Sequence, residues 1–306
     1  MSGSSKKSSF VPGWQGYSYP TGSNRKERVD RSSPSRLEAL SLEDEDALRV
    51  NASSYIGKLG MSLFISQHTI GIAHIFFHRF FSRQSFRTHE WSLIALASLF
   101  LASKVEENPK RLDEVVTHHF DITKPGMKVD SESESFKAYR ADVLNCERTL
   151  LHTLCFEICV TPAQKYIHDL VDCMKNAEKE RIGNQPEKVY SMSSGYNELQ
   201  NAALAFVNDS QSTNLCLQYP PYDIAYAGLL MGNKWMEQKK STWLFKDPKF
   251  GMELRQLDCP SPDEVDEICT QMQPTIMNPE RFAKVQQAMD EQQNQVAGDK
   301  KRRRLD

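Results

Sequence analysis

Three charged side chains stand in the most unusual settings of this 306-residue sequence. Lys104 and Glu107 follow directly on the apolar segment 94–102, and Glu147 stands on a segment otherwise patterned for burial. Charges at the border of an apolar core are costly unless they are paired or hydrogen-bonded. On pattern alone, we favour an ordinary surface pair of Lys104 and Glu107, worth roughly a few tenths of a kcal/mol, and a solvated Glu147.

Motifs of the common enzyme classes are missing from the sequence. It contains neither GxGxxG nor GxxxxGKS, and neither HExxH nor GxSxG. His78-Arg79-Phe80 resembles a kinase catalytic loop only superficially, because Phe80 stands where such a loop carries its proton-accepting Asp. We therefore expect no catalytic residue and no cofactor, and a protein that is not an enzyme.

The seven cysteines include no CxxC pair. Cys155 and Cys159 lie one helical turn apart with His118 and His119 upstream, but this spacing matches no zinc module. Most of the cysteines have apolar neighbours, where a free thiol behaves as a small buried hydrophobe. We expect neither a metal site nor a disulfide framework.

Composition excludes two broad classes of protein. Lys plus Arg number 38 and Asp plus Glu number 40, a formal charge of −2, whereas a protein that coats nucleic acid carries a strong basic surplus. The longest apolar run, 94–102, is far shorter than the roughly 20 residues that cross a bilayer. We expect an intracellular protein without membrane contact and without direct nucleic-acid binding.

Helical periodicity dominates between two polar tails. The segment 94–102 is apolar on every face, so its helix must be surrounded by other helices at the axis of a bundle. Thr161-Pro162 is a helix-start signature that opens the second half. The expected helices span 46–61, 66–80, 91–105, 112–116 and 136–154, then 163–176, 196–210, 221–235, a short one near Lys249, and 262–272.

The central helices of the two halves show a weak internal repeat. Set side by side, they pair Ala227 with Ala97, Leu229 with Leu99, and Lys234 with Lys104. A duplicated five-helix unit would show identities at these places. The predicted fold class is all-α, with two similar five-helix bundles at residues 44–159 and 160–288.

The two ends of the sequence have no lasting periodicity. Residues 1–43 are rich in Ser, Gly, Pro and Arg and are expected to form a disordered tail. Residues 289–306 form a second, basic tail that ends in Lys300, Lys301, Arg302, Arg303 and Arg304. Five adjacent cations must be solvated and are typical of a nuclear import signal, with a solubilising tail as the other interpretation. The insert 123–135 has no assignment.

Several stretches in combination resemble a cyclin box. The most specific is Lys104-Val105-Glu106-Glu107 followed by Pro109-Lys110-Arg111-Leu112, although Ser103 and Asn108 depart from the expected pattern. Asn51 to Phe80 resembles the opening of the box, Leu150 to Glu157 its last helix, and Leu217 to Trp235 the second cyclin fold of transcriptional cyclins. The likeness covers about residues 44–288 and is greatest to the T and K cyclins, including fungal-type members. The L and C types stay open.

This resemblance implies two tandem cyclin folds and a non-catalytic activator of a cyclin-dependent kinase. By motif, Lys104 and Glu147 correspond to the family's buried Lys–Glu pair, whose spare donors and acceptors bind main-chain groups near the kinase's regulatory helix. The other implied kinase-binding residues are Glu107 and Lys110 as rim charges, and Leu99, Leu144, Leu151 and Phe156 as apolar contacts. The likeness to T and K cyclins further implies a nuclear complex that phosphorylates the C-terminal domain of RNA polymerase II.

One modification site and two other functions complete the predictions. Ser33, followed by Pro34 in the expected disordered tail, has the form of a proline-directed phosphosite for the partner kinase. A TFIIB-like helical adaptor for DNA or the transcription machinery would share a duplicated five-helix fold, but the chain lacks the CxxC zinc ribbon and basic face expected of one. A helical scaffold without a kinase is the remaining interpretation.

Overall fold

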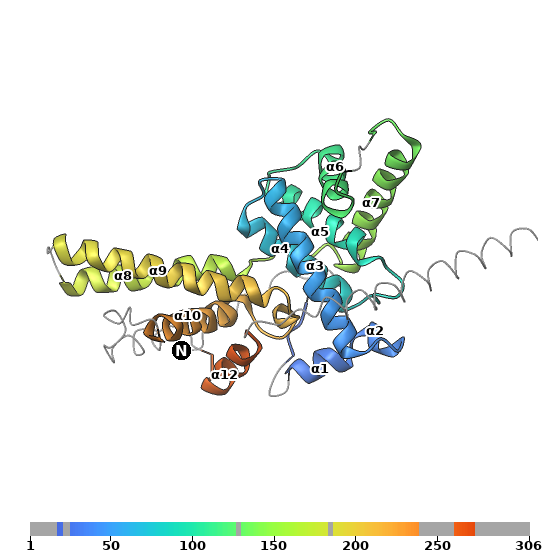
Figure 1. The fold of residues 1–306 in the computed structure, drawn as a ribbon. Helices are drawn as coiled ribbons and strands as arrows, with labels where there is room; N and C mark the ends of the chain where they lie inside the picture. Colours follow the sequence, from blue (N-terminus) through green and yellow to red (C-terminus); the bar gives the residue numbers. More distant parts are fainter. Residues whose placement is uncertain (1–16, 21–24, 127–129, 183–185, 239–259, 273–306) are drawn as a thin grey trace, which may run out of the picture.

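The computed structural model describes residues 17–20, 25–126, 130–182, 186–238 and 260–272. All regular secondary structure in these ranges is helical, which confirms the predicted all-α class (Figure 1). The helices are α1 (Arg25–Arg31), α2 (Pro34–Leu37), α3 (Leu42–Ser62), α4 (Gln67–Phe81), α5 (Trp91–Val105), α6 (Leu112–Thr123), α7 (Glu134–Thr153), α8 (Ala163–Ile182), α9 (Pro186–Ser210), the 3-10 turn η1 (Leu215–Leu217), α10 (Pro221–Gln238) and α12 (Pro262–Gln271).

Helix α5 is the axis of the first bundle, as its sequence predicted. It contacts α3, α4, α6 and α7, and every residue from Ile94 to Ser103 is buried. Fully buried apolar side chains of the neighbouring helices, such as Leu48 and Ile56 of α3 and Phe76 of α4, complete the core. A helix without a polar face is stable only when surrounded in this way.

Helix α10 has the corresponding central position in the second half. It contacts α8, α9, α12 and η1, and α8 and α9 form a long antiparallel pair beside it (Figure 1). The helices approach closely where residues are small: a Cβ added to Gly232 would lie 2.9 Å from the backbone nitrogen of Ala203 on α9. The helix predicted near Lys249 lies outside the described residues.

The prediction of disorder is wrong for the part of residues 1–43 that forms helices α1 and α2, which lie beside the start of α3 (Figure 1). Contacts with distant parts of the chain hold this segment. Arg25 forms an ion pair with Glu264 of α12, and the Tyr17 backbone N–H donates to the Glu157 carboxylate at 2.6 Å. Single polar contacts of this kind leave no periodicity in the sequence, so pattern analysis missed them.

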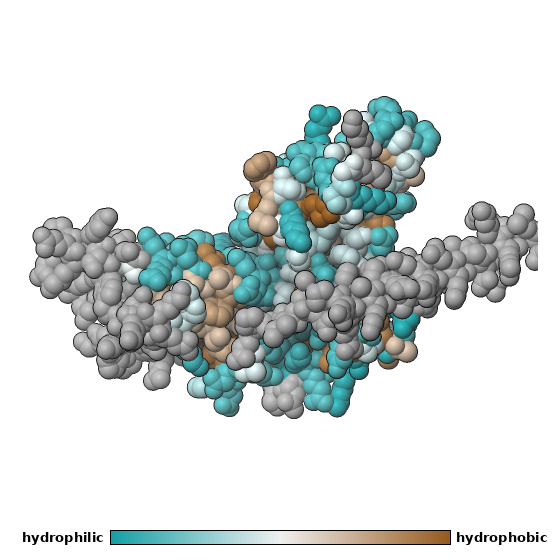
Figure 2. Space-filling view, in the orientation of Figure 1, coloured by the Kyte–Doolittle hydropathy of each residue, from teal (hydrophilic) through white to brown (hydrophobic). Residues whose placement is uncertain are grey.

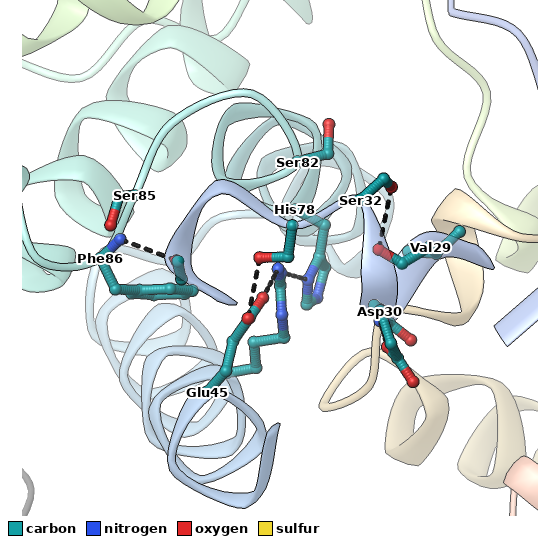
Figure 3. A network of polar contacts seen from close by, with 12 residues as sticks. Val29, Asp30, Ser32, Glu45, His78, Ser82, Ser85 and Phe86 are labelled. Atoms are coloured by element: carbon teal, nitrogen blue, oxygen red, sulfur yellow. Dashed lines mark hydrogen bonds and ion pairs between the residues drawn. The ribbon is translucent and has the colours of Figure 1, made fainter. Parts of the chain in front are cut away.

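A buried chain of polar contacts joins the N-terminal segment to both bundles (Figure 3). Ser33 Oγ donates to Glu45 at 2.8 Å, and Arg49 donates to Glu45 at 2.6 Å and to His78 Nδ1 at 2.9 Å. Since Nδ1 accepts from Arg49, the neutral ring donates from Nε2 to the Gln211 carbonyl, 2.9 Å away. Burial, with the Arg49 cation beside it, holds the pKa of His78 well below its ordinary value.

The premise of the Ser33 phosphosite, a disordered Ser-Pro sequence, is wrong. Ser33 is 4% exposed and its hydroxyl is bonded to Glu45, while Pro34 begins α2. A kinase could reach this hydroxyl only after α2 had separated from α3. The cluster from Lys300 to Arg304 and the rest of the predicted tail 289–306 lie outside the described residues.

The visible surface of the described residues is mostly hydrophilic, with apolar patches limited to a few areas (Figure 2). Within the same ranges, no helix combines the length and the apolar character that crossing a membrane requires. Five large apolar side chains are exposed among the described residues. They are Leu37, Met61, Phe64, Leu144 and Phe156.

Candidate functional site

Lys104 and Glu147 form an ion pair that joins α5 to α7. Lys104 Nζ lies 2.8 Å from Oε1 and 2.9 Å from Oε2 of Glu147, which confirms that the two side chains meet. The pair is less buried than the resemblance implied, because the side chain of Lys104 is 41% exposed and that of Glu147 is 11% exposed. The carboxylate is thus largely withdrawn from water, whereas the ammonium still faces it.

The exposed ammonium keeps a donor for another molecule. An ammonium has three N–H groups, and two suffice for the two Glu147 oxygens. Lys104 Nζ also lies 3.9 Å from the centroid of the Phe100 ring, one turn earlier on α5. This cation–π contact restricts the position of the ammonium without using an N–H. Sequence reasoning did not name Phe100, although the i,i+4 spacing to Lys104 was the available signal.

Glu107, just after the end of α5, has a left-handed backbone conformation. Its φ is +54°, its N–H donates to the Lys104 carbonyl at 3.2 Å, and the Asn108 N–H donates to the Ser103 carbonyl at 3.0 Å. This is the Schellman motif, in which glycine is the usual left-handed residue. The Glu107 side chain is exposed, and its role as a rim charge stays a prediction.

Ser103, one of the departures from the cyclin pattern, has a structural role. The residue is fully buried, its hydroxyl donates to the Phe100 carbonyl at 2.7 Å, and it accepts from the Lys110 N–H at 3.4 Å. The hydroxyl therefore ties the segment after α5 back to the helix. Lys110, the second predicted rim charge, is half-buried.

The predicted apolar residues divide into exposed and buried ones. On α7, Leu144 and Leu151 lie three residues before and four residues after Glu147, so all three share one helix face. Leu144 is 40% exposed and Leu151 is half-buried. Phe156, just after α7, is 56% exposed with φ +59°, and its ring contacts His152 edge to face. These three can touch another protein.

The prediction that Leu99 touches a partner is wrong. Leu99 is fully buried, because α5 is surrounded on all sides by α3, α4, α6 and α7. The residue belongs to the core, and its place in the recognisable motif reflects packing. Apolar residues beside a functional charge can support it from within the core without reaching the surface.

His119, one of the residues that could have suggested a metal site, has structural hydrogen-bond partners instead. His119 bonds Tyr55 at 2.7 Å through Nδ1 and Tyr139 at 2.8 Å through Nε2, and burial lowers its pKa to about 4. Across the part of the chain that the structure describes, no group of three His, Cys, Asp or Glu side chains could hold a metal ion. The ion pair and its apolar surroundings are the candidate site.

Comparisons with known proteins identify the family of the chain. Residues 24–159 match the cyclin N-terminal domain family. Arabidopsis thaliana Cyclin-T1-3 is 30% identical over 253 residues, which cover 80% of this chain and 71% of that protein. Cyclin-T1-5 from the same plant is 33% identical over 219 residues, or 70% of this chain, and the match spans only 34% of that longer protein.

A solved structure supports the fold over most of the chain. A chain of the yeast RNA Pol II CTD kinase CTDK-1 complex superposes with a TM-score of 0.60 at 15% identity, over 90% of this chain and 86% of that one. The match extends well beyond residues 24–159, so it includes the second bundle as well as the first. The chain belongs to the cyclin family and is similar to its T-type members.

Proposed function

We propose that this chain is the regulatory subunit of a cyclin-dependent kinase of the transcription class. Cyclins contribute no reacting group, so the chain would act by binding. Bound at α5 and α7, it would hold the kinase's regulatory helix in the position where the kinase's own Lys–Glu ion pair forms over ATP. Activation would then be a shift between two kinase conformations.

The observation that carries this proposal is the half-exposed Lys104–Glu147 pair. Glu147 fixes the ammonium while 41% of the Lys104 side chain still faces water, ready to donate to a carbonyl of another chain. Leu144 and Phe156, at 40% and 56% exposure, supply apolar area beside it. A surface of fixed polar groups with apolar neighbours is suited to protein binding.

Co-expression with each transcription-class kinase tests the proposal. One kinase should co-purify with the chain in equal amounts and gain activity only in the complex. Lys104→Ala should reduce activation at least about tenfold, while circular dichroism shows unchanged helix content. Arg148→Ala, an exposed change on α7 that leaves the pair intact, is the matched control. If no kinase binds or is activated, the chain is a scaffold or adaptor instead.

The substrate and the location form the finer part of the proposal. The yeast complex with the same fold is a kinase of the RNA polymerase II C-terminal domain, which suggests this substrate here. Peptides with the polymerase repeat should be phosphorylated faster by the complex than a histone peptide. A fluorescent fusion should lie in the nucleus, and replacing the cations from Lys300 to Arg304 with Gln tests whether this cluster directs it there.

A further inference from the structure

The turn between α3 and α4 holds the most exposed aromatic side chain among the described residues. Phe64 is 90% exposed, and Met61, one turn earlier, is 58% exposed. On either side of Phe64, Leu63 and Ile65 are only 1% and 7% exposed. These two anchors fix the backbone of the turn, which directs the Phe64 side chain outward into solvent.

The backbone at Phe64 is strained in the same way as at Glu107. Its φ is +53°, its N–H donates to the Met61 carbonyl at 3.0 Å, and the Ile65 N–H donates to the Gly60 carbonyl at 2.9 Å. This Schellman position favours glycine or asparagine, and a bulky residue is unfavourable there. A strained, solvated phenylalanine stabilises neither the turn nor the core, and such outliers cluster at functional sites.

Four helices among the described residues end in this way. α2 ends with left-handed Ala39, α3 with Phe64, α5 with Glu107, and α7 with Cys155 followed by Phe156. Each end has the same pair of backbone hydrogen bonds and a residue other than glycine at the left-handed position. At α5 and α7, these ends belong to the candidate kinase-binding surface. The ends of α2 and α3 have no assigned role, and of these two only the end of α3 carries an aromatic side chain at its left-handed position.

The α3–α4 turn adjoins that surface. His68, in the first turn of α4, lies 3.4 Å from the carboxylate of Glu106, the C-cap of α5 two residues after Lys104. On the inner side of the turn, a Cβ added to Gly60 would lie 3.7 Å from the Leu99 side chain of α5. A typical interface covers about 800 Å² on each partner, roughly a disc of 16 Å radius. A kinase bound at Lys104 therefore extends over neighbouring helix ends.

We propose that Met61 and Phe64 are an additional anchor for the same kinase subunit, inserted against an apolar part of its surface. This inference rests on the proposed function, since it extends the interface around Lys104 and Glu147. The kinase is the occupant that continuity with this surface favours. Because the backbone of the turn is already fixed, binding would order only the Phe64 side chain itself.

Replacement of Phe64 by glycine separates binding from folding. Phe64→Gly removes the backbone strain, so the free chain should melt about 2–4 °C higher. Loss of the phenyl contact should weaken binding to the kinase that co-purifies with the chain. The dissociation constant should rise about tenfold to a hundredfold. Asparagine also tolerates the left-handed region, so Phe64→Asn should likewise melt higher and bind the kinase more weakly. Leu37→Ala, at an 83% exposed leucine of α2, is the matched control and should leave kinase affinity unchanged.

A photo-crosslinker tests the contact directly. Benzoylphenylalanine at position 64 of the full chain should crosslink to the kinase in the assembled complex, and the same group at position 37 should not. If Phe64→Gly binds the kinase as wild type does while Lys104→Ala binds weakly, the anchor is wrong and the proposed function stands. Crosslinking to a different protein also overturns the anchor. If the wild-type chain binds no kinase, the proposed function itself fails.

Discussion

The Lys104 ammonium lies within 2.9 Å of both carboxylate oxygens of Glu147, a residue 43 positions away on another helix. The two side chains differ in exposure, 41% for Lys104 and 11% for Glu147. The two side chains therefore depend on each other to different extents. The carboxylate depends on the ammonium for its stability inside the protein, whereas the ammonium also has water.

Truncation of the pair should therefore affect folding unequally. Lys104→Ala leaves a mostly buried carboxylate without its cation and should reduce the free energy of unfolding by about 1–2 kcal/mol, below the 3–5 typical of fully buried pairs because the lysine is partly solvated. Glu147→Ala leaves a half-exposed ammonium and should cost less than about 1 kcal/mol. Urea denaturation of the free chain measures both. A greater loss for Glu147→Ala would contradict this account.

Glu107 allows strain and charge to be separated. Glu107→Gly should raise the free energy of unfolding by about 0.5–1 kcal/mol, because glycine accepts a φ of +54° without steric cost. Glu107→Gln keeps the strain and removes the charge, so its stability should equal that of wild type. If Glu107 is a rim charge, both variants should reduce the rate of kinase association, and most strongly at low salt. Unchanged association rates in both would remove Glu107 from the interface.

The arrangement of the first bundle was largely predictable, because α5 is apolar on every face and can only be central. Cyclin-like motifs then placed Lys104 and Glu147 together. Leu99 was misassigned because a motif does not separate residues that touch a partner from residues that support them. Its full burial is a property of the assembled bundle, in which four other helices surround α5.

The N-terminal segment could not be predicted for a different reason. Its place depends on individual long-range contacts, such as the ion pair of Arg25 with Glu264, 239 residues later. Such contacts leave no repeating pattern of apolar residues. The left-handed backbone at Phe64 and Glu107 was also not predicted. Glycine is the residue that normally signals this conformation, and neither position is a glycine.

The buried pair of Glu45 and Arg49 should behave differently from the half-exposed pair. Their side chains are 4% and 2% exposed, and Arg49 also donates to His78. Arg49→Met should cost about 3–5 kcal/mol, because it leaves Glu45 as an unpaired buried charge. The double variant Glu45→Met/Arg49→Met should recover a large part of that loss. Chemical denaturation of the three proteins checks this, and a double variant no more stable than Arg49→Met would refute it.

Acidification should destabilise the chain through its buried histidines. His74 is fully enclosed, with Nδ1 donating to the Ile70 carbonyl at 2.8 Å and Nε2 accepting from Ser53 at 3.0 Å, and burial lowers its pKa to about 4. In the unfolded chain the pKa is about 6.5. Between these values the unfolded chain binds a proton that the folded chain does not. The stability contribution is therefore complete above about pH 6.5 and is lost as the pH falls toward 4.

For His74 alone, this linkage amounts to at most about 3 kcal/mol at pH 4. His74→Asn keeps a donor for the Ile70 carbonyl and cannot titrate, so its stability should fall less than that of wild type between pH 7.5 and pH 5. Carboxylates contribute equally to both proteins, and the difference between the two urea-denaturation series isolates the histidine. Parallel pH profiles for wild type and His74→Asn would mean that the pKa of His74 is the same in the folded and the unfolded chain.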